Sequence, residues 1–143
     1  MTDRIILNIY SKAKRGDPLA KILIVDDSLI IRKTLERIVT EKGHEVIATG
    51  KDGIEGVDLY TKHQPDVMFL DITMPNKDGK ECLKEIIEKY PDAKIIMFSA
   101  ISDEEEKSRC ISLGASRFIN KGENLMQEEN KEKIVQAVEE LSQ

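Results

Sequence analysis

From about residue 21 onward, short runs of apolar residues alternate with longer segments in which apolar residues recur every three or four positions. A short apolar run rich in β-branched residues predicts a buried strand, and the longer period predicts an amphipathic helix. Five strands are predicted, and they cover Ile22–Val25, Glu45–Thr49, Val67–Leu70, Ile95–Phe98 and Arg117–Asn120. Strands that alternate with helices favour an α/β fold, a doubly wound five-stranded parallel sheet.

Each predicted strand is followed by a predicted helix with recognisable end signals. Ser28 and Asp103 are of the type that caps helix N-termini, and both precede an apolar stripe. Gly43 and Gly114 stand where the first and fourth helices should end, because glycine readily adopts the conformation that terminates a helix. The remaining helices are predicted around Gly53–Tyr60, Cys82–Tyr90 and Ile134–Leu141.

Residues 1–20 lie outside this plan and are predicted to be an N-terminal extension or linker, with one domain at 21–143. Ile5, Leu7 and Ile9 alternate as in a strand, but Ile5 and Ile9 are also one helical turn apart. The range 11–18 resembles a linker in composition. Two roles stay open for the extension, a mobile tail or a segment that docks on the domain or on a second copy.

Composition excludes several classes of function. The 143 residues carry a formal net charge of -5 and no Trp, which argues against a general nucleic-acid or membrane surface. Cys82 and Cys110 lack metal-ligand spacing, so we predict reduced, buried thiols in a cytoplasmic protein. His44 and His63 are predicted to be surface residues. No apolar run is long enough to span a membrane.

Polar residues stand at the ends of four predicted strands. Asp26 and Asp27 follow the first strand, Asp71 the third, Ser99 the fourth and Lys121 the fifth. In doubly wound folds the functional crevice lies at the carboxyl ends of the strands, so these side chains should converge. Three carboxylates repel one another unless a cation joins them, and an all-oxygen set suits Mg²⁺. Such a site could support attack by a carboxylate on phosphorus.

Four segments together resemble the signatures of two-component response regulator receiver domains. They read ILIVDDS at 22–28, FLDITMPNKDG at 69–79, MFSA at 97–100 and RFINK at 117–121. The resemblance covers roughly residues 20–141 and implies a chemotaxis-type single-domain response regulator. It also implies a flavodoxin-like (βα)5 fold with strand order 2-1-3-4-5.

The resemblance implies a role for each strand-end residue. Asp71 matches the phosphoacceptor. Asp27 matches a direct Mg²⁺ ligand, Asp26 a ligand acting through water, and the backbone carbonyl of Thr73 a further ligand beside Asp71. Lys121 matches the lysine that pairs with the phosphoryl group.

Ser99 matches the switch hydroxyl and Phe118 the switch aromatic of the same family. The family implies a sensor histidine kinase or phosphotransfer protein as donor and a protein as downstream target. That target would contact the surface of the domain's fourth helix, fifth strand and fifth helix, without direct nucleic-acid or membrane binding. The chain would be no enzyme beyond its own phosphorylation and dephosphorylation, and a dimer that forms on phosphorylation stays open.

Three positions mark where this chain departs from the family or tunes it. Gly122 follows Lys121 where the family usually has a proline, so a cis bond is not expected there. Ile101 and Thr73 occupy positions that influence phosphate lifetime in the family, and an apolar Ile101 predicts a long-lived phosphoryl group.

Two alternative functions remain: a receiver fragment of a longer regulator, and a phosphatase with Asp71 as nucleophile. The phosphatase would need a second acid where Thr73 stands.

Overall fold

A computed structural model describes residues 3–100, 103–122 and 124–143. It contains a five-stranded parallel sheet with strand order β2-β1-β3-β4-β5, so the predicted fold class and strand order are confirmed. The strands are β1 (Lys21–Val25), β2 (Glu45–Gly50), β3 (Val67–Asp71), β4 (Ile95–Ser99) and β5 (Arg117–Asn120).

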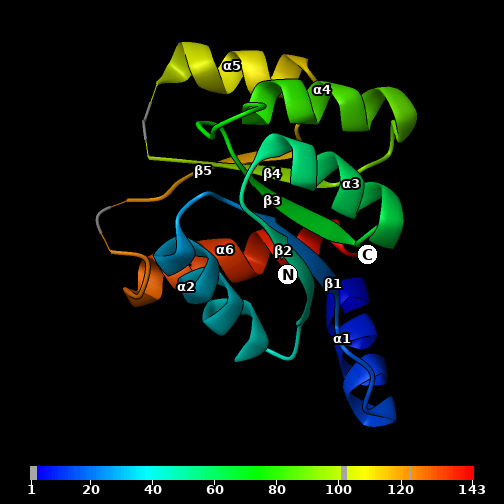
Figure 1. Cartoon of the computed structure of the whole chain (residues 1–143). Helices are drawn as coiled ribbons and strands as arrows, with labels where there is room; N and C mark the ends of the chain where they lie inside the picture. Colours follow the sequence, from blue (N-terminus) through cyan, green and yellow to red (C-terminus); the bar gives the residue numbers. More distant parts are fainter. Residues whose placement is uncertain (1–2, 101–102, 123) are drawn as a thin grey trace.

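Helices cover both faces of the sheet (Figure 1). One face carries α3, α4 and α5, and the other carries α2 and α6. The helices are α1 (Asp3–Arg15), α2 (Leu29–Thr40), α3 (Gly53–His63), α4 (Gly79–Lys89), α5 (Glu104–Ser112) and α6 (Glu128–Leu141). The domain's fourth and fifth helices are therefore α5 and α6.

Side-chain caps explain where four of these helices begin. Ser28 accepts a hydrogen bond from the N–H of Ile31 at 3.3 Å, and Asp103 accepts one from Glu105 at 2.9 Å. Asp52 and Asp78 cap α3 and α4 in the same way, and each accepts a hydrogen bond of 2.9 Å from a backbone N–H in the first turn of its helix. These contacts satisfy backbone donors that a helix start leaves unpaired.

The alternation of side chains along each strand divides the core into two clusters. On β3, Met68 and Leu70 pack under α3 and α4, whereas Val67 and Phe69 pack against the α2 and α6 side. Both clusters are fully buried on the central strands, as expected for a parallel sheet covered on both faces. Cys82 and Cys110 are buried free thiols in the first cluster, which confirms their predicted core role.

The structure corrects two sequence expectations outside the sheet. The extension forms one helix, α1, as far as Arg15, so the predicted linker from Ser11 is wrong and the connection is limited to residues 16–20. His44 is only 4% exposed, so its predicted surface position is also wrong. It follows Gly43 in the turn that leads into β2, and it is buried although residues 41–43 of that turn are exposed.

Among the described residues, no helix combines the length and apolar character that crossing a bilayer requires.

Candidate functional site

Three carboxylates meet at the carboxyl edge of the sheet. Asp26 and Asp27 come directly after β1, and Asp71 ends β3, the neighbouring strand. One oxygen of each carboxylate lies within 4.8 Å of the other two. Asp26 and Asp71 are buried, whereas Asp27 is exposed. The predicted convergence is therefore present, with one acid open to solvent and two held inside.

Backbone and side-chain contacts hold Asp26 in place. Its Oδ1 accepts a hydrogen bond from the N–H of Ser28 at 2.9 Å. Its backbone carbonyl accepts one from the guanidinium of Arg32 at 2.7 Å. The start of α2 therefore orients this carboxylate toward the crevice, because Ser28 is the cap of that helix.

Lys121 supplies the basic partner that Asp71 lacks in its own strand. Its Nζ lies 2.7 Å from Oδ2 of Asp26 and 3.2 Å from Oδ1 of Asp71. The N–H of Lys121 donates to the carbonyl of Ser99 at 2.7 Å, which continues the pairing of β4 with β5. The lysine side chain is 12% exposed, so solvent screens these attractions only weakly.

The electrostatic balance at Asp71 disfavours its ionised form. Burial, followed by the negative charge of Asp26, raises the pKa of Asp71 to about 6, although Lys121 acts in the opposite direction. A carboxylate that stays unfavourably charged near neutral pH gains strongly from an added cation. This set of carboxylate oxygens fits a hard divalent ion such as Mg²⁺, and exposed Asp27 leaves one side open for water or a phosphoryl oxygen.

The loop after β3 is held against the strand by a close approach. The N–H of Gly79 donates to the carbonyl of Ile72 at 2.7 Å. A Cβ atom at Gly79 would lie only 2.0 Å from the carbonyl oxygen of Asp71, so no larger residue fits there. Thr73 is exposed on this loop, and its role as a carbonyl ligand stays a prediction.

Asp52 and Asn76 hold the same loop from the β2–α3 side, and sequence reasoning missed both. Asn76 has a left-handed backbone with φ of 67°, and its side-chain amide donates to Oδ2 of Asp52 at 2.8 Å. The N–H of Gly53 donates to the carbonyl of Lys77 at 2.9 Å. The only available signal was the turn composition of the two segments, because their contact joins residues 24 positions apart.

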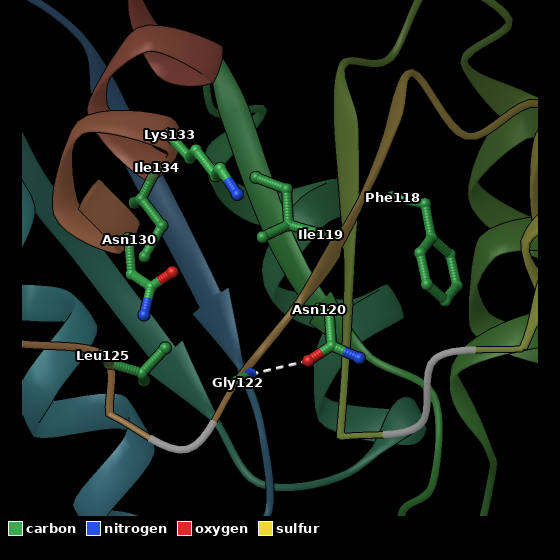
Figure 2. A pocket seen from close by; sticks show the side chains of 8 residues that line it. All are labelled: Phe118, Ile119, Asn120, Gly122, Leu125, Asn130, Lys133 and Ile134. Atoms are coloured by element: carbon green, nitrogen blue, oxygen red, sulfur yellow. Dashed lines mark hydrogen bonds between the residues drawn. The ribbon is translucent and has the colours of Figure 1, made fainter. Parts of the chain in front are cut away.

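The two switch candidates lie on adjacent strands. Ser99 is buried at the end of β4 and is paired in register with Asn120, while Phe118 is paired with Met97. Phe118 is partly buried and packs against the α4 and α5 side. Figure 2 shows its ring on the opposite side of β5 from Ile119. Both residues lie on the strands that the sequence predicted for them, and their switch roles stay predictions.

Gly122 gives the loop after Lys121 a conformation that proline cannot adopt. Its φ is 67°, whereas proline is restricted to about -65°. Its N–H, which proline lacks, donates to Oδ1 of Asn120 at 2.7 Å (Figure 2). No peptide bond within the described ranges is cis. A cavity of about 320 Å³ lies beside this turn, between β5 and α6.

Ile101, the residue predicted to prolong the phosphoryl lifetime, falls outside the described residues.

A doubly wound parallel sheet with an acidic carboxyl edge and a lysine after its last strand is the architecture of a two-component receiver domain. The model of the response regulator receiver domain family matches residues 22–138, and the chain belongs to this family.

Curated relatives and solved structures agree with this assignment. The chemotaxis protein CheY of Listeria monocytogenes is 42% identical over 103 residues, which cover 72% of this chain and 87% of the relative. The CheY of Bacillus subtilis is 41% identical over 101 residues, with coverages of 71% and 84%. A crystal structure of the CheX–CheY–BeF3–Mg²⁺ complex from Borrelia burgdorferi matches with a TM-score of 0.80. That match has 36% identity and covers 90% of this chain and 92% of the other.

Proposed function

We propose that this receiver domain accepts a phosphoryl group on Asp71 and thereby controls a protein partner. The donor would be a phosphohistidine of a sensor histidine kinase or phosphotransfer protein. The observation that carries the proposal is the buried Asp71 carboxylate, which shares one crevice with two acids and lies 3.2 Å from the Lys121 ammonium.

The transfer needs a carboxylate nucleophile and charge neutralisation around phosphorus. An oxygen of Asp71 forms a bond to phosphorus while the phosphorus–nitrogen bond to the donor imidazole breaks. Lys121 is already beside Asp71 and would pair with the transferred group, since phosphoryl transfer depends mainly on positioning and electrostatic stabilisation. The chain would turn over no other substrate, so its chemistry is limited to its own phosphorylation and dephosphorylation.

A bound Mg²⁺ would neutralise part of the negative charge at this site. Asp27 and Asp71 would hold it directly, Asp26 through water, and Thr73 through its backbone carbonyl. The close grouping of the three carboxylates supports this assignment.

The response would reach the surface of α5, β5 and α6. Ser99 is one residue from Phe98, the register partner of Asp71. This nearness supports the proposal that its hydroxyl would meet a phosphoryl oxygen. Phe118 on the neighbouring strand would turn inward in response. A shift of this kind changes the population of two surface states that a partner can distinguish. The CheY relative in complex with CheX supports a protein, rather than a nucleic acid, as the partner.

Incubation with a small phosphodonor tests the proposal. With acetyl phosphate and Mg²⁺, the wild-type chain should gain an acid-resistant, base-labile phosphate, detected by intact-mass spectrometry. Asp71→Asn should abolish the labelling, and omission of Mg²⁺ should reduce it strongly. Asp58→Asn, which removes an exposed carboxylate on α3, is the matched control and should label like wild type. Equal labelling of the Asp71→Asn chain would overturn the proposal.

A further inference from the structure

Lys121 reaches Asp71 across an intervening strand. The strand order places β4 between β3, which ends at Asp71, and β5, which Lys121 follows (Figure 1). Two strand spacings amount to about 9–10 Å. The lysine side chain therefore extends over the end of β4, because its Nζ lies 3.2 Å from Oδ1 of Asp71. The residues that end β4 form the surface that this side chain crosses.

The ring of Phe98 lies at that crossing. Phe98 precedes Ser99, the last residue of β4, and the Lys121 ammonium is over the ring at 5.8 Å from its centroid. This distance is within the range of cation–π attraction. The Lys121 side chain is 12% exposed, and such attractions are stronger where the groups are shielded from water. The ring should therefore contribute to the position of the ammonium.

Asp71 and Phe98 project from the same face of the sheet. They are register partners on the adjacent strands β3 and β4, and paired residues on neighbouring strands point to one side. Phe69, two residues before Asp71, lies with Phe98 in the core cluster under α2 and α6, which identifies the face. A carboxylate and an aromatic ring thus stand side by side where the lysine arrives.

The core fixes the position of the Phe98 ring. Phe98 is 1% exposed, and the Phe69 ring packs against it with an interplanar angle of 77°. Ile119, the register partner of Phe98 on β5, packs against the same cluster. Close packing on several sides leaves a side chain little room to move, so the ring is a rigid support for the lysine.

An aromatic ring can hold the ammonium without neutralising it. Nζ of Lys121 lies 2.7 Å from Asp26 and 3.2 Å from Asp71, so two carboxylates already share its charge. The ring has no net charge and attracts a cation through the negative potential of its face. Lysine has a flexible four-carbon stem, and positioning of this charge is what phosphoryl transfer requires. A contact with Phe98 restricts the stem and leaves the charge available.

We propose that Phe98 is a positioning residue that holds the Lys121 ammonium beside Asp71 before the phosphoryl group arrives. The inference rests on the proposed function, because that function assigns Lys121 to the transferred group. Phe98 acts through Lys121 alone. Its replacement should therefore slow phosphoryl transfer to Asp71, and the slowing should require the lysine.

Phosphorylation kinetics test this role. The rate at which acetyl phosphate labels Asp71 is followed by intact-mass spectrometry at saturating Mg²⁺. Phe98→Leu should slow the labelling about threefold to tenfold, the size expected for loss of a shielded cation–π contact. Phe69→Leu is the matched control, because it removes the same ring from the same cluster at the same 1% exposure. Phe69 lies two residues before the strand end, and its replacement should change the rate less than about twofold.

A double-mutant cycle with Lys121→Met separates positioning from a general loosening of the core. In the Lys121→Met chain, Phe98→Leu should change the remaining rate less than about twofold. A merely structural role predicts the same slowing in both backgrounds. Where Lys121→Met labels too slowly to follow, the four chains of the cycle are compared by urea unfolding in EDTA. Phe98→Leu should then shift the unfolding equilibrium constant at least about threefold less when Lys121 is absent.

Circular dichroism establishes that each variant is folded. Phe98→Met, which fills the site with a flexible apolar side chain, replaces Phe98→Leu if that chain does not fold. The inference is wrong if the Phe98 variant labels as fast as wild type, if Phe69→Leu slows labelling equally, or if the cycle shows no coupling to Lys121. Each of these results leaves the proposed function intact. A wild-type chain that takes up no phosphate, or Asp71→Asn that labels equally, contradicts the proposed function and this inference together.

Discussion

At the scale of single residues, Asp71 is a carboxylate whose surroundings oppose its charge. Its pKa rises to about 6 because burial and Asp26 outweigh the attraction to Lys121. Between its unfolded value and about pH 6, the folded chain keeps a proton that the unfolded chain loses. Stability therefore falls as the pH rises through this window. Above about pH 6 the Asp71 carboxylate is ionised in both states, and the full loss of stability of the metal-free fold has then been reached.

Asparagine at position 71 should accordingly stabilise the metal-free protein. We expect Asp71→Asn to raise the free energy of unfolding by about 1–3 kcal/mol at about pH 7.5, and the gain should vanish near pH 4. Urea unfolding in EDTA at several pH values measures the difference. Asp58→Asn, at an exposed site, should change stability little at either pH. An Asp71→Asn chain that is no more stable than wild type at neutral pH contradicts this assignment of the charge balance.

At the scale of elements, the loop after β3 depends on contacts from outside its own strand. Asp52 is buried, and its pKa is lowered by the N–H of Glu55 and by the amide of Asn76. The carboxylate is therefore ionised and accepts charge-assisted hydrogen bonds, which are stronger than neutral ones. This contact joins the β2–α3 turn to the loop on which Thr73 lies.

Asn76→Gly isolates that contact, because glycine adopts the left-handed backbone of Asn76 without strain. Loss of a hydrogen bond to a charged group should lower the free energy of unfolding by about 1–3 kcal/mol at neutral pH. A lowered pKa means that stability is lost as the pH falls through the folded value. The difference from wild type should therefore shrink in acid.

Urea unfolding at about pH 7 measures the expected loss of unfolding free energy, and the same measurement at about pH 3 tests whether the difference from wild type shrinks in acid. Mg²⁺ titration of the same variant adds a functional measurement, and weaker Mg²⁺ binding is expected if the loop supplies the Thr73 carbonyl. A variant as stable as wild type at neutral pH, or a difference that persists unchanged in acid, would show that the Asp52–Asn76 contact does not hold the loop.

The helix boundaries show how much of each element was available from the sequence. Predicted caps at Ser28 and Asp103 are confirmed because capping depends on residues within one turn. The extension was ambiguous because Ile5, Leu7 and Ile9 fit both periods. The structure resolves this ambiguity in favour of a helix. Helix α1 extends to Arg15, past Ser11, where the linker was expected to start.

At the scale of the whole molecule, one sheet separates two core clusters that share its strands. Phe69 lies in the cluster under α2 and α6, where its ring packs edge-on against Phe98 at a centroid distance of 6.0 Å. Tyr60 and Tyr90 lie on the other side, with ring centroids 5.3 Å apart. Since both clusters are anchored on the same strands, the domain should unfold as one cooperative unit.

Tyrosine fluorescence can report this coupling because the chain has three Tyr and no Trp. Phe69→Leu should lower the free energy of unfolding by about 1–2 kcal/mol. The urea midpoint should shift equally by circular dichroism and by tyrosine emission from the opposite layer. Tyr10→Phe removes the exposed tyrosine of α1 and should leave the midpoint unchanged. A tyrosine transition that stays in place while the helical signal shifts would show that the two layers unfold separately.

The amino-acid sequence by itself determined the strands, the helix caps, the fold class and the set of residues at the strand ends. These follow from short-range rules of periodicity, capping and strand direction. It also determined the family, because four motifs stand in order at the ends of predicted strands.

The tertiary structure alone decided which of these groups touch. The 3.2 Å approach of Lys121 to Asp71 and the contact of Asn76 with Asp52 depend on strand order and register, which no local pattern specifies. The burial of His44 and the separation of α1 from the domain depend on how the chain packs around the sheet. Contacts between residues distant in the chain arise only when several elements have already packed together. The sequence could therefore predict that Lys121 and Asp71 share one edge of the sheet, but not their distance, and it missed the contact of Asn76 with Asp52.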